Sequence, residues 1–366
     1  MLTESDLREL LEYTSQNQVL SLYLNTEPAQ GNADAYRLRL RSMLKDLELP
    51  KDVDRIEQYF AHEYDWTGRS VAVFSCAPDG FFRAYPLSVT LNSRVWVGNH
   101  PHFKPLADIW DAYGGYGVVL VDKQGARLFY FHLGELEEQE GTLGEEVKHV
   151  KRGGASTVAG RRGGIAGRTG YEDEVVDRNM KASADFAVHF FEAKSIRRIL
   201  IGGTDDNVQA FLAEFPKAWQ SLVVGTFPIA MTASHVEVLG KAMQTGEEAE
   251  KKREHKMINA AVTASAKGSG GAVGVENVLN AVSNHRVQTL MFRDGYVSQG
   301  VQCQNCGLIT PHKLDVCPLC SSKTEKVSDV VDLAVRSVLQ SGGDVEVVHN
   351  SHELDQVGSI AAILRY

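Results

Sequence analysis

The stretch GVVLVDKQGARLFYFHL, residues 117–133, predicts the central element of the fold. Residues 117–122 and 126–133 are rich in branched and aromatic apolar side chains, which is typical of β-strands. Residues 123–125 read KQG, and a short polar segment with glycine is a common connection between antiparallel strands. The sequence therefore predicts a β-hairpin here.

The residues that follow alternate between helical and strand patterns. A helix is expected from about Glu172, because its first turn is acidic and the helix dipole favours negative charge there. An apolar strand is expected over residues 196–201, with a further helix after it. The two helices are marked by apolar residues at helical spacing: Val176, Met180, Ala184, Ala187 and Phe191 in the first, and Phe211, Phe215, Trp219 and Leu222 in the second. This alternation predicts a layered α/β domain over residues 113–235.

A glycine-rich cationic loop is predicted inside this domain, over residues 148–170. It holds no Asp or Glu from Lys148 to Arg168, although the whole chain has a net charge of -9. Glycine keeps a backbone thin and permissive, and Arg and Lys contact phosphates. The candidate RNA-binding residues are Lys148, Lys151, Arg152, Arg161, Arg162 and Arg168. The composition favours insertion into a crowded polyanion, with the ribosome as the leading candidate, and a linker or a solvated loop as the alternative.

The flanking segments predict two further domains. Residues 1–112 are interpreted as an α/β domain that contains a basic amphipathic helix over residues 35–47. A solvated face and an RNA contact are both open interpretations of that helix. Residues 236–366 are interpreted as a long charged connector helix followed by a small α/β domain.

Four of the five cysteines form the sharpest chemical signal, within residues 300–325. Their spacing is Cys303-x2-Cys306-x10-Cys317-x2-Cys320. Two such knuckles supply four thiolates to a tetrahedral Zn²⁺ ion, and a segment this short has little core of its own without the metal. The spacing therefore predicts a structural zinc ion. Its closed ligand shell argues against catalysis. Cys76, in an apolar strand-like run, is expected to be a core thiol.

Length, composition and missing motifs exclude several classes of protein. A chain of 366 residues with 43% hydrophobic and 23% charged residues is ordinary for a globular protein of two or three domains. The N-terminus is polar and acidic, and no apolar run reaches the length of a membrane span, so we expect a cytoplasmic protein without a membrane partner. The patterns GxxxxGK[ST], HExxH and GxSxG are missing, and we assign no catalytic residue.

The order of these parts resembles a known family. A basic Gly-Gly loop in a middle α/β domain precedes a connector helix and a small domain with a zinc knuckle, and the chain ends in VGSIAAILRY, residues 357–366. This layout resembles the archaeal and eukaryotic class 1 peptide-chain release factor superfamily, which includes Pelota and whose last strand has a similar Gly-Ile-x-x-Ile-Leu-Arg-Tyr ending. The chain looks most like the divergent bacterial branch, which includes a ribosome hibernation factor.

The resemblance implies a place on the ribosome for each domain. The middle domain would enter the peptidyl-transferase centre like the acceptor end of a tRNA. The third domain would be L7Ae-like and would face the stalk base and a partner translational GTPase. The first domain would lie near the decoding centre.

Two departures from the family bear on activity. Residues Arg152, Gly153, Gly154, Ala155 and Ser156 line up with the family's Arg-Gly-Gly-Gln-Ser, so alanine replaces the glutamine that helps position water against the peptidyl-tRNA ester. Loss of one such contact costs about 10²–10³ in rate. The family's Asn-Ile-Lys-Ser loop is replaced by GNADAYR at residues 31–37, which argues against stop-codon reading.

The sequence thus predicts a non-decoding translation factor that occupies the ribosomal A site, in rescue or hibernation. Its partners would be the ribosome and its rRNA, and we expect a monomer off the ribosome. Two alternatives remain open. One is a codon-independent release factor or peptidyl-tRNA hydrolase that uses the backbone of Ala155, and the other is an RNA-binding protein unrelated to the ribosome.

Overall fold

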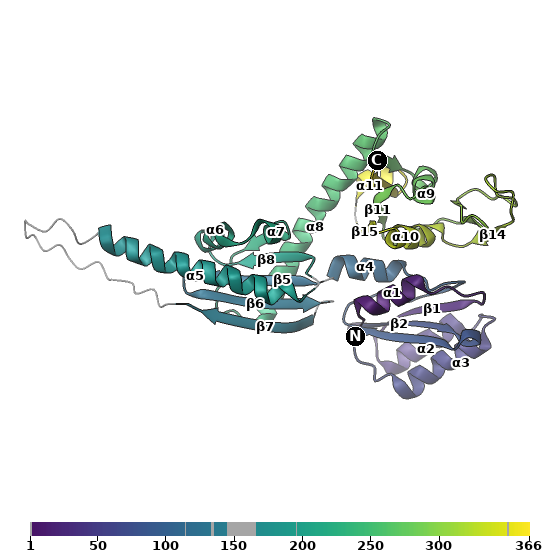
Figure 1. Cartoon of the computed structure of the whole chain (residues 1–366). Helices are drawn as coiled ribbons and strands as arrows, with labels where there is room; N and C mark the ends of the chain where they lie inside the picture. The colour runs from purple at the N-terminus through teal and green to yellow at the C-terminus, as the bar shows by residue number, and fades with distance from the viewer. Residues whose placement is uncertain (1, 114, 133–134, 145–165, 195, 350) are drawn as a thin grey trace, which may run out of the picture. The chain divides into compact units, whose positions relative to one another are not determined.

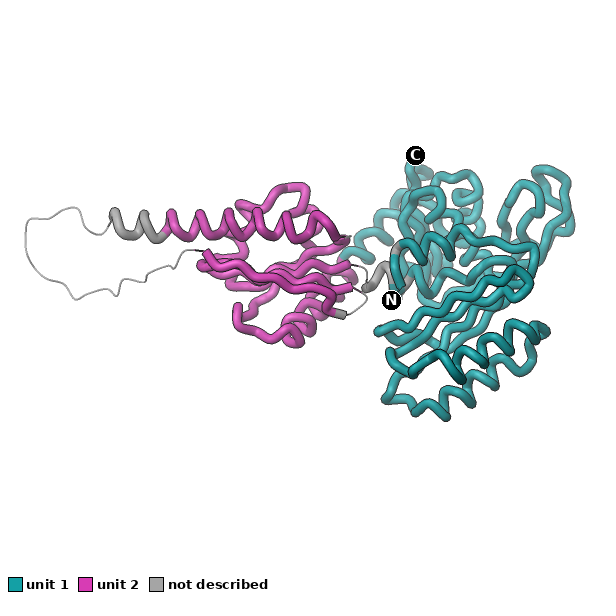
Figure 2. The backbone as a smooth tube through the Cα atoms, turned by 60° about the horizontal axis from the view of Figure 1, so that its bottom comes forward, with its two compact units in different colours: residues 1–112, 253–366 teal, residues 113–252 magenta. Residues whose placement is uncertain are grey.

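The computed structural model describes residues 2–113, 115–132, 135–144, 166–194, 196–349 and 351–366. The chain forms two compact units (Figure 2). One unit combines residues 1–112 with residues 253–366, and the other consists of residues 113–252. The predicted mixed α/β fold class is confirmed. The division into three domains stays a prediction.

The unit of residues 113–252 is built on a sheet with the strand order β7-β6-β5-β8-β9 (Figure 1). Its strands are β5 (Tyr116–Asp122), β6 (Gly125–His132), β7 (Glu135–Leu143), β8 (Arg198–Gly202) and β9 (Val223–Phe227). The predicted hairpin is confirmed, because β5 and β6 pair antiparallel and Asp122 lies opposite Gly125 at the turn. β8 pairs parallel with both β5 and β9. The acidic strand β7 pairs with β6 and lies at the edge of the sheet.

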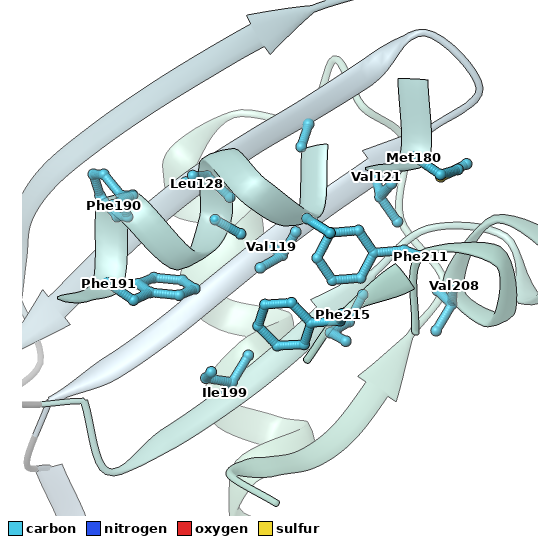
Figure 3. Close-up of a cluster of buried hydrophobic side chains, with 14 of the residues drawn as sticks. Val119, Val121, Leu128, Met180, Phe190, Phe191, Ile199, Val208, Phe211 and Phe215 are labelled. Carbon is cyan, nitrogen blue, oxygen red and sulfur yellow. The ribbon is translucent and has the colours of Figure 1, made fainter. Parts of the chain in front are cut away.

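Helices α5 (Ala166–Glu192) and α6 (Asp205–Glu214) cover one face of this sheet. The side chains between them form a cluster that includes Phe191, Phe211 and Phe215 (Figure 3). The second predicted helix is broken after α6, since Pro216 follows Phe215 and a residue before proline is pushed out of the helical region. A short helix, α7 (Lys217–Gln220), resumes after it.

Helix α8 (His235–Ala266) confirms the predicted connector helix. Its first part packs Val238 and Ala242 against the other face of the sheet of residues 113–252. Its last part packs Ile258 and Ala261 against the C-terminal sheet of the other unit. The chain passes from one unit to the other at residues 252 and 253, within this helix.

The N-terminal segment of the other unit forms an antiparallel sheet with the strand order β3-β2-β1-β4. The strands are β1 (Val19–Asn25), β2 (Ser70–Cys76), β3 (Phe81–Leu87) and β4 (Arg94–Gly98), and the helices are α1 (Glu4–Glu12), α2 (Ala33–Leu44), α3 (Pro50–Gln58) and α4 (Lys104–Tyr113). α2 and α3 bury their apolar stripes against β1 and β2 in one cluster. Cys76 is buried, as predicted for a core thiol.

The C-terminal segment contains a sheet with the order β10-β16-β11-β15, in which β11 and β15 are parallel. Its elements are β10 (Gly271–Val273), α9 (Val275–Ser283), β11 (Val287–Arg293), α10 (Val330–Gln340), β15 (Asp344–Val348), α11 (His352–Gln356) and β16 (Ile360–Leu364). A second small sheet, in the order β13-β12-β14, is inserted between β11 and α10. It consists of β12 (Gly300–Cys303), β13 (Ile309–Thr310) and β14 (Thr324–Val327).

Candidate functional site

The four predicted metal ligands come together on the small inserted sheet. Their sulfur atoms all lie within 4.8 Å of one another. The Sγ atoms of Cys303 and Cys320 are 3.3 Å apart, and those of Cys306 and Cys317 are 3.5 Å apart. Four sulfurs around a tetrahedral Zn²⁺ lie roughly 3.8 Å from one another, given a Zn–S bond of about 2.3 Å. The spacing therefore fits such an ion, and it is too long for disulfide bonds.

Both cysteine pairs are held by the same kind of turn. In the first, Gly307 donates its N–H to Cys303 O at 3.2 Å, and Cys303 donates its own N–H to Leu308 O at 2.9 Å. In the second, Ser321 and Ser322 make the matching bonds with Cys317, at 2.9 and 2.8 Å. Each turn needs a left-handed residue, which is Gly307 (φ +71°) in one and Ser321 (φ +58°) in the other. Such a turn points both of its thiols the same way.

Hydrogen bonds and burial shift the pKa values of the cysteine thiols by different amounts. The N–H of Cys306, aided by that of Asn305, lowers the pKa of Cys303 despite its desolvation. The hydroxyl and N–H of Ser322 lower the pKa of Cys320 to about 5. The N–H of Leu308 acts the same way on Cys306, but desolvation and the neighbouring thiols raise the pKa of Cys306 to about 12. Crowded thiolates repel one another, so a full set of four requires a cation between them.

The cluster has the composition of a structural metal site. Four cysteine ligands would fill a tetrahedral shell and would leave no open position for a substrate. The small sheet that carries them has short strands, and β13 spans only Ile309–Thr310. A metal ion at this point would hold the insertion together. Ser322, whose hydroxyl and N–H act on Cys320, was missed in the sequence, although a small polar residue just after the last cysteine is the signal for it.

The predicted Gly-Gly loop is largely outside the described residues. Strand β7 ends at Leu143 and helix α5 begins at Ala166. The predicted site residues that lie outside the described residues are Lys148, Lys151, Arg152, Gly153, Gly154, Ala155, Ser156, Arg161 and Arg162. Arg168 falls within α5, so the predicted loop end at residue 170 and helix start at Glu172 are wrong. An existing helix can be extended without a new nucleation step, because each added residue forms one more backbone hydrogen bond, and this offsets part of the cost of the glycines at 167 and 170.

Two arginines of the basic helix α2 make contacts within the N-terminal segment. Arg37 lies 5.1 Å from the ring centre of Trp66, and Arg39 donates to Asn25 O at 3.4 Å. Arg41 and Lys45 are exposed, and so is Leu38, at 71%. The RNA-contact interpretation of this helix therefore depends on the exposed pair.

No helix in the described part of the chain is both long and apolar enough to cross a membrane.

Comparison with known protein families finds a similarity in the middle of the chain. Residues 101–247, less than half of the chain, match the model of bacterial archaeo-eukaryotic release factor family 10. The match spans the unit of residues 113–252 almost completely, including the segment between β7 and α5. No curated protein sequence matches the chain.

Release factors and Pelota are among the solved structures that align with the chain, all at low similarity. Pelota from Archaeoglobus fulgidus is 14% identical, with 100% of this chain and 92% of that chain covered and a TM-score of 0.32. Dom34 from S. cerevisiae, described as a translation termination-like factor, is 11% identical, with 81% and 79% covered and a TM-score of 0.40. The C-terminal domain of a peptide chain release factor from Methanosarcina mazei is 23% identical, with 37% and 98% covered and a TM-score of 0.28. These alignments are weak, and the family match does not depend on them. Over residues 101–247, the chain is similar to bacterial archaeo-eukaryotic release factor family 10.

Proposed function

We propose that this protein binds the ribosome and acts there as a translation factor at the A site, in rescue or hibernation. The observation that carries the proposal is the family match of residues 101–247, because this segment contains the cationic Gly-Gly sequence. Arg152, Arg161, Arg162 and Arg168 would bind rRNA phosphates, and Gly153 and Gly154 would permit a close backbone approach.

Stop-codon reading and efficient peptide release are not part of the proposed function. Ala155 stands where the release factors have glutamine, and residues 31–37 lack the Asn-Ile-Lys-Ser sequence. The first difference removes a group that positions water, and the second removes a decoding loop. The protein would thus occupy the site in the cytoplasm without terminating translation, with a translational GTPase as a proposed delivery partner.

We further propose that Cys303, Cys306, Cys317 and Cys320 bind a structural Zn²⁺ ion. The sulfur spacing and the paired turns support this assignment. The ion would stiffen the small inserted sheet, and it would supply no chemistry to a substrate.

Co-sedimentation of the purified protein with ribosomes through a sucrose cushion tests the ribosome proposal. Binding is expected at low salt and should weaken steeply at moderate salt, because cationic residues displace counterions from RNA. The double change Arg161→Glu and Arg162→Glu should abolish it. The matched control is Lys251→Glu with Lys252→Glu, which makes the same charge change at exposed positions of α8 in the same unit.

The outcomes separate the competing functions. Salt-sensitive binding that survives the control change and is lost with the loop change supports the proposal. Peptide release from stalled complexes would favour a codon-independent release factor. Tight binding to isolated RNA without binding to ribosomes would favour an RNA-binding protein of another kind, and no binding to either would overturn the proposal.

A further inference from the structure

One face of helix α10 carries three polar side chains that contact the N-terminal segment of the same unit, and two of them are buried. Asp332, Arg336 and Gln340 are spaced four residues apart, so they lie in one row along the helix. Asp332 is 2% exposed and Arg336 is 5% exposed. Charged side chains are rarely buried this far unless each is paired.

The carboxylate of Asp332 holds the N-terminus of helix α4. Its Oδ1 atom accepts hydrogen bonds from the N–H groups of Phe103, at 3.0 Å, and Lys104, at 2.9 Å. His100 Nε2 lies 3.3 Å from Oδ2, and His102 Nδ1 lies 3.4 Å from Oδ1. The first N–H groups of a helix lack partners within the helix and carry partial positive charge, so a carboxylate is a favourable partner for them.

The next two side chains in the row hold the C-terminus of helix α1. Arg336 donates to the carbonyl oxygens of Leu10, at 3.3 Å, and Tyr13, at 2.6 Å. Gln340 donates from Nε2 to Leu11 O at 3.0 Å. The last carbonyl groups of a helix lack partners and carry partial negative charge, which suits a guanidinium. The carboxylate of Asp332 therefore binds a helix N-terminus, and the guanidinium of Arg336 binds a helix C-terminus.

A second buried ion pair lies beside this row. Lys104 Nζ is 2.9 Å from Asp329 Oδ2, and both side chains are less than a tenth exposed. Lys104 also donates to the carbonyl oxygen of Tyr296. Asp329 is the N-cap of α10 and accepts from Val331 N–H at 3.1 Å. The starts of α4 and α10 are thus joined to each other by charge as well as by hydrogen bonds.

We propose that α10 is a latch that joins residues 1–112 and residues 253–366 into a single body and that opens as a unit. Breaking one side of a buried charged network leaves the other charge desolvated and unpaired, which is strongly unfavourable. The α4 end and the α1 end should therefore open together. The unit of residues 113–252 would then move relative to one body rather than two. This inference goes beyond the proposed function and does not depend on it.

Amide hydrogen exchange of the wild-type protein in low concentrations of denaturant tests the latch directly. The amides of Phe103 and Lys104, at the start of α4, and that of Tyr13, at the end of α1, should exchange through one opening reaction. The expected result is the same opening free energy and the same dependence on denaturant for all three. Separate values for the two helix ends would overturn the proposal.

Variants test the coupling from each end. Asp332→Asn should accelerate exchange about tenfold or more at residues 100–106, and equally at residues 10–13, which Asp332 does not touch. Arg336→Met, which alters the α1 end, should likewise accelerate exchange at residues 10–13 and equally at residues 100–106. The control is Asp355→Asn, which removes an exposed ion pair with Arg293 in the same segment and should change neither region. Acceleration confined to the altered side chain's own partners would show ordinary packing instead of a latch. The wild-type experiment decides the matter if a variant fails to fold.

Discussion

At residue 155, alanine stands where the Arg-Gly-Gly-Gln-Ser pattern of release factors has glutamine. The loop reads Arg152-Gly153-Gly154-Ala155-Ser156, so only the group that would position water is missing from the pattern. We expect Ala155→Gln to raise the rate of peptide release from stalled ribosomal complexes by about 10²–10³ over the wild type. The measurement is the release of labelled peptide over time. Ala159→Gln, in the same loop, is the control and should have no effect. If Ala155→Gln releases no peptide, the loop does not reach the peptidyl-tRNA ester.

The residues of the cysteine cluster make a prediction about metal content. Wild-type protein purified with zinc should hold about one zinc ion per chain, released only by a strong chelator or by thiol modification. Cys320→Ser should reduce this content to near zero, because the remaining three sulfurs leave the shell open. Cys76→Ala is the control, since that thiol is buried in another part of the fold and should not affect the metal. Equal zinc content in all three proteins would place the metal elsewhere.

At the scale of an element, the charged groups of α10 and the histidine that contacts it indicate how stability depends on pH. Burial lowers the pKa of His102, although Asp332 and Asp329 raise it, and Lys104 and His100 lower it. Burial raises the pKa of Asp332, yet His102, His100 and the N–H of Lys104 hold it well below its usual value. Burial lowers the pKa of Arg336 to about 10, so this side chain keeps its charge at neutral pH.

Both depressed pKa values act in the same direction on stability. The neutral form of His102 stabilises the fold above its unfolded pKa of about 6.5, and this contribution is lost as pH falls below that value. The carboxylate of Asp332 contributes above about pH 4 and is lost below it. Urea unfolding of the unit should therefore show stability falling below pH 6.5, and again below pH 4. In His102→Gln the first decrease should shrink. A decrease of unchanged size in that variant would assign it to other histidines.

Elements with a local signal were predictable, and contacts between distant elements were not. The hairpin of β5 and β6 follows from strand-forming residues on both sides of a short glycine-containing turn, and helix α8 follows from its charge pattern. Strand β7 was missed because its glutamates have low strand propensity, and pairing with β6 overrides that preference. Asp329 caps the start of α10 and also pairs with Lys104, which is 225 residues away and which no local pattern indicates.

The same difference between local and distant contacts applies to the candidate sites. The cysteine cluster was predictable from sequence because its ligands are grouped within residues 303–320. The latch was not, because Asp332 and Phe103 are 229 residues apart and neither belongs to a recognisable motif. A hint was present in the charged residues of an otherwise apolar helix, VVDLAVRSVLQ, where buried Asp332 and Arg336 interrupt the valines. Nothing in the sequence indicates which helix ends they contact.

For the whole molecule, positive charge is gathered in one segment of an otherwise acidic chain. The chain as a whole is acidic, with a net charge of -9, so general attraction to RNA is unfavourable. The cationic residues between Lys148 and Arg168 concentrate positive charge in one segment. Binding to the ribosome should therefore be orientation-specific, and its salt dependence should weaken by about one unit of slope for each phosphate contact removed.

The two compact units also predict two unfolding transitions. Each unit has hydrophobic clusters of its own, and the cysteine cluster belongs to the unit of residues 1–112 and 253–366. A zinc chelator should therefore lower the unfolding midpoint of that unit, by about 2–4 °C for each kcal/mol of stability lost, and leave residues 113–252 unchanged. Scanning calorimetry measures the transitions, and hydrogen exchange of individual peptides assigns them.

The control for this experiment is Cys320→Ser, whose transitions should already be shifted and should not respond to the chelator. A single transition that shifts as a whole would mean that the two units unfold cooperatively, against the division seen in the structure. A shift confined to residues 300–325 would mean that the metal stabilises only the inserted sheet. The latch would then have to be rigid without it, because Asp329 and Asp332 lie just beyond β14 and keep their partners in α4.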